Sequence, residues 1–150
     1  MRRVLVFVGA LALLWSGLPT IAAASPQLSA GFLFFGELSV FVPAMELGGS
    51  WPLFSSLQGS AALLYATSGR WGLALGLTRP VSGQLALTAG ALLGLDALEG
   101  FFAQGLLKAR WGFPLGRQAQ FFNELGIHIP LGRGFWQLRY GAGLSLALRF

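Results

Sequence analysis

The strongest constraint on this chain is the strict alternation of side chains over its last residues, 135–150. One parity holds large apolar residues: Trp136, Leu138, Tyr140, Ala142, Leu144, Leu146, Leu148 and Phe150. The other parity holds small or polar residues: Gln137, Arg139, Gly141, Gly143, Ser145, Ala147 and Arg149. Because successive side chains of a strand point to opposite faces, this run predicts one strand with an apolar face and a small, polar face. A membrane β-barrel turns the first face to lipid and the second to its lumen.

The same alternation of large and small residues recurs in residues 71–78 and 84–91. Backbone groups in hydrocarbon must all be hydrogen-bonded, so strands with a lipid-facing side have to close into a barrel. A helical span over the uncharged residues 47–69 is the alternative, but glycine, serine and proline crowd that segment. A soluble lipocalin-like barrel would place the large side chains inside, which contradicts the outward leucine and tryptophan faces.

Proline and glycine divide the chain into strands, because proline cannot donate to a strand ladder. We expect eight strands, at about residues 28–42, 44–51, 57–66, 71–79, 84–93, 101–113, 119–129 and 135–150. The first hairpin turns at Pro43 in this division, and a turn at Gly36-Glu37 is equally compatible with the pattern. The prediction is therefore an all-β, eight-stranded antiparallel up-and-down transmembrane β-barrel.

The amino-terminal residues have the form of a secretory signal peptide. Met1-Arg2-Arg3 is basic, residues 4–15 are apolar, and Ala22-Ala23-Ala24 provides the small residues that precede a cleavage site. A retained membrane helix is the alternative, but the apolar run is shorter than the roughly 20 residues that a span requires. We expect residues 1–24 to be a signal peptide and residues 25–150 to form the barrel.

Composition agrees with a membrane protein. Charged residues make up 10% of the chain and hydrophobic residues 55%, whereas soluble domains carry roughly 25% charged residues. The chain has no cysteine, so it has no disulfide and no thiol chemistry, and we expect neither a metal nor a cofactor. The arginines are spread singly, so no basic stripe is available to bind nucleic acid.

The aromatic last strand resembles the sorting signal of bacterial outer-membrane barrels, which commonly ends in Phe. Here that signal would comprise Tyr140, Leu144, Leu146, Leu148 and Phe150. The chain as a whole resembles the small eight-stranded outer-membrane β-barrels of the OmpA/OmpX type. The resemblance implies an integral protein of a Gram-negative-type bacterial outer membrane, which contacts outer-membrane lipids and uses the barrel-assembly machinery during insertion. It implies no particular oligomeric state.

With its start in the periplasm, the barrel would place the turns at Pro52, Pro80 and Pro114 on the periplasmic side. All outer loops would then be short, and only one of them would carry charge, from Asp96 and Glu99. We interpret these two carboxylates as part of a solvated loop; a cation-mediated contact with lipopolysaccharide is the alternative.

The alternation also predicts which polar residues face the lumen: Glu37, Glu46, Lys108, Arg110, Glu124, His128, Arg139 and Arg149. Charges in a narrow lumen are costly unless they are paired. We expect Glu124 to pair with Lys108, Arg110 or Arg139, and Glu37 to pair with Arg139 or Arg149. At eight strands the interior is just wide enough for side chains, so these pairs would plug it.

Five aromatic residues close to the predicted strand ends are expected to form a girdle at the membrane interface. They are Trp51, Trp71, Trp111, Trp136 and Tyr140. Ordinary outward packing is the alternative role for these side chains.

The sequence favours a structural or interaction role without catalysis. The alternatives are a lipid-modifying enzyme, similar to the lipid A deacylases, or a narrow conduit for small molecules. Catalysis would need Ser145, His128 and Glu124 to assemble across two strands. The His-x-Ser pattern associated with that deacylase family is absent, because Pro130 stands two residues after His128.

Overall fold

The computed structural model describes residues 12, 25–37, 40–54, 56–132 and 134–148, and for residues 35–37 and 40 it describes the backbone alone. Eight strands account for most of these residues: β1 (Gln27–Glu37), β2 (Val40–Phe54), β3 (Leu57–Ala66), β4 (Trp71–Pro80), β5 (Leu85–Asp96), β6 (Gly100–Pro114), β7 (Ala119–Pro130) and β8 (Gln137–Ala147). Each strand pairs with the next in an antiparallel manner, and β1 also pairs with β8. The predicted eight-stranded antiparallel closed barrel is confirmed. The expected signal peptide lies outside the described residues, apart from residue 12.

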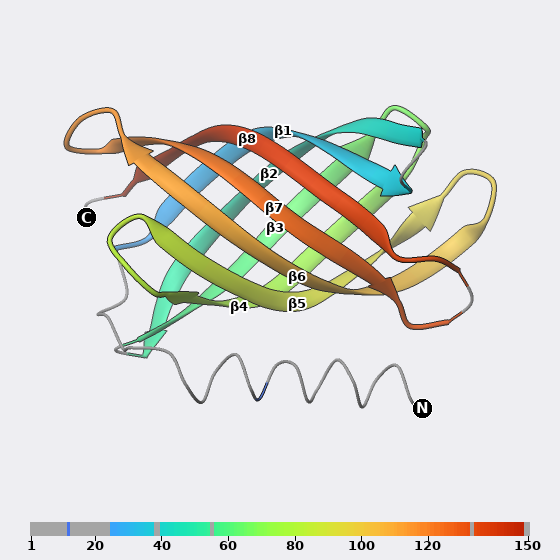
Figure 1. Ribbon diagram of the computed structural model, residues 1–150, viewed down its shortest axis with the longest axis horizontal. Coiled ribbons are helices and arrows are strands. Elements are labelled where there is room, and N and C mark those ends of the chain that lie inside the picture. The colour runs from blue at the N-terminus through green and yellow to red at the C-terminus, as the bar shows by residue number, and fades with distance from the viewer. Residues whose placement is uncertain (1–11, 13–24, 38–39, 55, 133, 149–150) are drawn as a thin grey trace.

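The strands cross the barrel obliquely, and the hairpins gather at its two ends (Figure 1). We call the end where β1 starts and β8 finishes the proximal end. It carries the β2–β3, β4–β5 and β6–β7 turns. The opposite, distal end carries the β1–β2, β3–β4, β5–β6 and β7–β8 connections. Within the described ranges, no helix is both long and apolar enough to cross a membrane.

Large apolar side chains cover the outside of the barrel. Leu75 of β4 is 46% exposed and Leu146 of β8 is 53% exposed, whereas Ala74, next to Leu75, is buried. In β8 the inward Arg139 is completely buried. A soluble barrel has the opposite distribution, so the lipocalin-like alternative is wrong.

The first hairpin differs from our principal division of the sequence. The chain turns between Glu37 and Val40, and Pro43 lies inside β2, where it pairs with Phe34 of β1. The Pro43 carbonyl accepts a hydrogen bond from the backbone amide of Thr67, 3.0 Å away, in the connection beyond β3. Since the N–H and C=O of a strand residue point to the same side, the missing donor of Pro43 faces this connection and costs no ladder bond. The turn at Gly36-Glu37 was thus the better of the two interpretations.

The other predicted boundaries are correct to within a few residues. The largest differences are at β2, which continues to Phe54, and at β5, which continues to Asp96. Pro52 is tolerated within β2 because the β2–β3 register shifts between Pro52 and Phe54, as it does at a β-bulge. β8 runs from Gln137 to Ala147, whereas the sequence predicted a strand over residues 135–150, of which the last two lie outside the described residues.

Three pairs of glycines face each other across neighbouring strands: Gly31 with Gly143, Gly72 with Gly94 and Gly76 with Gly90. A methyl group added at Gly90 would lie 2.6 Å from the Gly76 Cα, and one added at Gly143 would lie 2.7 Å from the ring of Phe122. These distances are far inside van der Waals contact. We infer that the close approach at these glycines lets the strands bend tightly enough to close a small barrel.

We therefore predict that Gly90→Ala destabilises the barrel by about 1–3 kcal/mol, the usual cost of overpacking. The matched control is Gly83→Ala in the β4–β5 turn, where an added methyl group meets nothing within 4 Å. Denaturant unfolding of both variants measures the difference. Equal stability of the two variants would contradict the role assigned to the glycine pair.

Candidate functional site

Five charged side chains form one network in the middle of the lumen, and we call it the ion-pair network: Glu46 of β2, Lys108 and Arg110 of β6, Glu124 of β7 and Arg139 of β8. All five occupy inward positions of the alternation, and Arg110 lies directly opposite Glu124 in the β6–β7 register. Glycines opposite the longer side chains make room for them. Arg139 pairs with Gly126, and Glu124 pairs with Gly141.

Glu124 is the centre of the network. Its Oε2 accepts hydrogen bonds from Arg110 Nε at 3.1 Å and Nη2 at 2.8 Å, and Lys108 Nζ lies 3.4 Å from the same oxygen. Its Oε1 accepts from Arg139 Nε at 2.7 Å and also from Arg139 Nη2. Each of the three partners that the sequence suggested for Glu124 is therefore in contact with it.

Glu46 is the second anion of the network, and sequence reasoning assigned it no partner. Its Oε2 accepts from Arg139 Nη2 at 2.6 Å, and its Oε1 lies 3.4 Å from Lys108 Nζ and 3.8 Å from Arg110 Nη2. Arg139 thus bridges the two carboxylates. The alternation places Glu46 inside the barrel, but its partners lie on β6 and β8, which are not neighbours of β2 in the ring, and such contacts leave no signal in the alternation.

For two other charged residues predicted to face the lumen, the structure does not describe the side chain. Glu37 ends β1, but its side chain is outside the described set, and Arg149 lies outside the described residues. The suggested pairing of Glu37 with Arg139 or Arg149 stays a prediction. Arg139 forms ion pairs with Glu46 and Glu124.

His128 is completely buried, and its Nδ1 lies 3.1 Å from Oε1 of Gln104. Ser145 lies opposite Gln120 in the β7–β8 register, with its hydroxyl 3.5 Å from the Gln120 amide oxygen. Gln120 and His128 stand eight residues apart on β7, roughly 26 Å along a strand. The structure therefore does not bring together the Ser145, His128 and Glu124 set that catalysis would need. Among the described residues, no group of three histidines or carboxylates forms a metal site.

A second polar cluster lies at the distal end around Arg70, which is buried although it stands just outside β4. Its Nε donates to Asp96 at 3.1 Å, its Nη2 lies 3.9 Å from Glu99, and its guanidinium stacks 4.4 Å from the ring of Phe102. Asp96 also accepts hydrogen bonds from the backbone amides of Leu98 and Glu99. The solvated-loop interpretation was therefore wrong for Asp96, whereas the side chain of Glu99 is 75% exposed.

Sequence reasoning missed Arg70 as a lumen residue. It precedes the outward Trp71 by one position, so extending the alternation by a single residue would have found it. Apolar side chains also fill the distal half of the lumen more than the sequence suggested. Leu33, Leu64, Leu92 and Leu106 are each at most 2% exposed and point inward from four strands.

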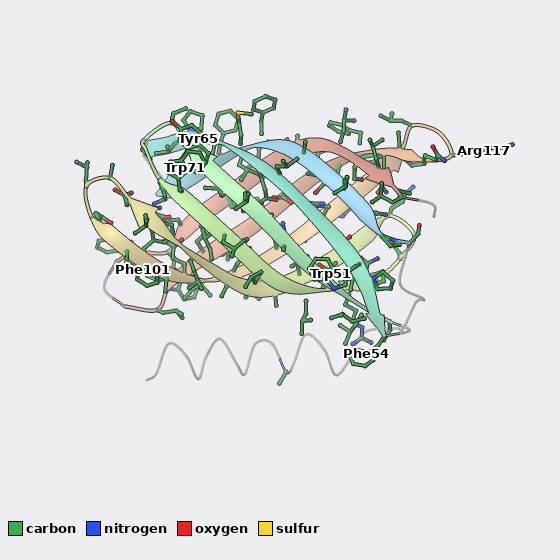
Figure 2. The ribbon with its side chains drawn as sticks, turned by 180° about the vertical axis from the view of Figure 1, so that it is seen from behind. Trp51, Phe54, Tyr65, Trp71, Phe101 and Arg117 are labelled. Carbon is green, nitrogen blue, oxygen red and sulfur yellow. The ribbon has the colours of Figure 1, made fainter. Side chains whose placement is uncertain are left out.

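Exposed aromatic side chains gather toward the barrel ends. Figure 2 shows Tyr65, Trp71 and Phe101 at the distal end and Trp51 and Phe54 at the proximal end. The five residues of the expected girdle are all exposed: Trp51 43%, Trp71 59%, Trp111 40%, Trp136 52% and Tyr140 49%.

Comparison with known proteins supports the fold alone. No protein-family model matches the chain, and no curated protein matches it. A solved structure described as "De novo design of transmembrane beta-barrels" is similar, with a TM-score of 0.60 and 11% sequence identity over 84% of this chain and 98% of that one. The chain is thus a small eight-stranded β-barrel whose fold resembles that of a transmembrane barrel, and the charges buried inside it are consistent with a plugged lumen.

We predict that Glu124→Gln destabilises the barrel by about 3–5 kcal/mol, because breaking a buried ion pair leaves uncompensated charges in a desolvated site. Three cations would then face one carboxylate. Glu99→Gln is the control, since Glu99 is mostly exposed and such surface changes stay within about 0.5 kcal/mol. The measurement is the free energy of unfolding of each variant. A cost for Glu124→Gln as small as that for Glu99→Gln would show that the network contributes little.

Proposed function

We propose that this protein is a small integral β-barrel of a bacterial outer membrane, exported by its signal peptide, with a structural or interaction role and no catalytic activity. The observation that carries the proposal is the inverted polarity of the barrel: leucine and aromatic side chains cover its outside, and the charges of the ion-pair network are buried inside. A wall of this kind is stable in hydrocarbon and would aggregate in water. The likeness to a designed transmembrane barrel supports the same conclusion.

The aromatic residues at the barrel ends support a girdle that fixes the height of the barrel in the bilayer. Trp51 and Trp111 would anchor the proximal interface, and Trp71, Trp136 and Tyr140 the distal one. We place the proximal end in the periplasm, because the chain would enter from that side after export. The short distal loops offer little surface for a soluble ligand, so the apolar wall itself is the main contact area for outer-membrane lipids or a partner protein.

The structure of the lumen favours a sealed barrel over a conduit. The ion-pair network crosses the lumen from β2 to β6, where Lys108 contacts Glu46, and the buried leucines fill the space on its distal side. An ion would have to break pairs in a desolvated site to pass, and breaking such pairs is costly. This arrangement suits a protein that occupies and stiffens the membrane.

We predict that the purified protein, reconstituted in a planar bilayer, shows no stepwise ion conductance. The ion-pair network and the layer of buried leucines (Leu33, Leu64, Leu92 and Leu106), which we call the leucine layer, block the lumen. The same preparation is expected to hydrolyse neither labelled lipid A nor labelled phospholipid. Protection of the barrel from protease in lipid vesicles is the positive control for insertion. Steady single-channel currents would overturn the sealed barrel, and lipid hydrolysis would overturn the non-enzymatic role.

We further predict that Phe150→Ala in the full-length precursor lowers the amount of assembled barrel in the outer membrane, because the terminal aromatic residue resembles a sorting signal. Phe113→Ala is the matched control. It removes an exposed aromatic side chain near the proximal end of β6. The measurement is the fraction of protein that shows the heat-dependent electrophoretic shift of a folded barrel. An equal loss in both variants would argue against a signal at residue 150.

A further inference from the structure

The proximal half of the lumen contains a cavity of about 190 Å³. Small inward residues of β2, β3, β4 and β5 form one side of it, including Gly48, Ser60, Ala62, Gly76 and Thr88. None of these side chains is long enough to cross the lumen. The cavity therefore exists because these neighbouring strands carry small residues where β6 and β7 carry long ones.

Two cations and one carboxylate also line the cavity. The cations are Lys108 and Arg110 of β6, and the carboxylate is Glu46 of β2. They belong to the ion-pair network, in which three cations share two carboxylates, so the network keeps one excess positive charge. Arg139 is fully buried, whereas 23% of the Arg110 side chain is exposed. The excess charge is thus presented to the cavity through Arg110 and Lys108.

The surroundings of the cavity add to this preference for negative charge. Among the described residues, the proximal end of the barrel carries no carboxylate side chain. Asp96 and Glu99 lie at the distal end, beyond the leucine layer. A charged pocket with low-dielectric walls concentrates ions of opposite sign.

We propose that this cavity is a binding site for one small oxyanion of the phosphate class. Arg110 and Lys108 donate to the anion, and hydroxyls that also line the cavity, Ser60 and Thr88 among them, complete its hydrogen bonds. The cavity is smaller than the roughly 300–1,000 Å³ of pockets for drug-sized ligands, which favours a compact ion over an extended chain. The distal leucine layer makes the site a blind pocket, entered from the proximal end alone.

The test measures binding of inorganic phosphate to the purified protein in nonionic detergent, by titration calorimetry at fixed ionic strength. We expect saturable binding that Arg110→Met weakens at least about tenfold, the effect of losing a charge-assisted hydrogen bond. Arg110→Lys keeps the charge and retains most of the binding. Arg117→Met, which removes the same charge from an exposed turn outside the cavity, leaves binding unchanged. If Arg117→Met and Arg110→Met weakened phosphate binding equally, the effect would come from the overall charge of the protein, and the proposed site would be overturned.

A second variant keeps the test independent of the ion-pair network. Ser60→Leu fills the cavity and leaves all charges in place, so we expect it to abolish phosphate binding while the heat-dependent electrophoretic shift shows an intact barrel. Retained binding in folded Ser60→Leu would overturn the proposal, as would absence of saturable binding to the unaltered protein.

A parallel titration with short-chain phosphatidic acid separates the two sources of phosphate. Binding of this lipid without binding of free phosphate would overturn the free ion as ligand. None of these outcomes alters the conductance test of the sealed barrel.

Discussion

The closed ring of backbone hydrogen bonds is the constraint on which the rest of this structure depends. Once β1 pairs with β8, no strand edge remains, and every ladder group can be satisfied within the ring. Only then can the outer surface consist of leucine and aromatic side chains. The ring is small, so strands must approach closely where it bends, and the pairs Gly76–Gly90 and Gly31–Gly143 allow that approach. Closure also holds the five charges of the ion-pair network in a narrow interior.

The interior is divided along its length because the strands differ in the size of their inward residues. Leu33, Leu64, Leu92 and Leu106 fill the distal part, and the ion-pair network spans the middle. Beyond the network, small residues of β2 to β5 leave the cavity that faces Lys108 and Arg110. A sealed barrel and a blind cationic pocket are thus two consequences of one arrangement. The side chains that close the lumen on one side supply the unbalanced charge on the other.

The alternation predicted well whatever depends on one strand alone, such as the outward side of Leu75 and the inward side of Glu124. The errors concern features that a neighbouring segment decides. Pro43 was read as a turn because proline lacks a donor, but the donor it lacks would have faced a connection rather than a strand. Asp96 was read as solvated, yet Arg70 reaches it from another hairpin. The alternation within one strand says nothing about contacts between strands that are not neighbours in the ring. The sequence therefore indicated no partner for Glu46.

The ion-pair network contains two kinds of contact: contacts between adjacent strands, and contacts that form only once the barrel has closed. Arg110 and Glu124 lie opposite each other on adjacent strands, so a β6–β7 hairpin can form their pair before the barrel is complete. Arg139 and Glu46 are 93 residues apart in the chain, and β1 separates their strands in the ring. Their contact requires that β8 has already met β1. In an unclosed sheet Glu46 would therefore lack its bridge to Glu124 through Arg139, and a buried carboxylate without its cation is costly. We infer that the fully paired network stabilises the closed ring specifically, in addition to the ladder bonds gained at the β1–β8 seam.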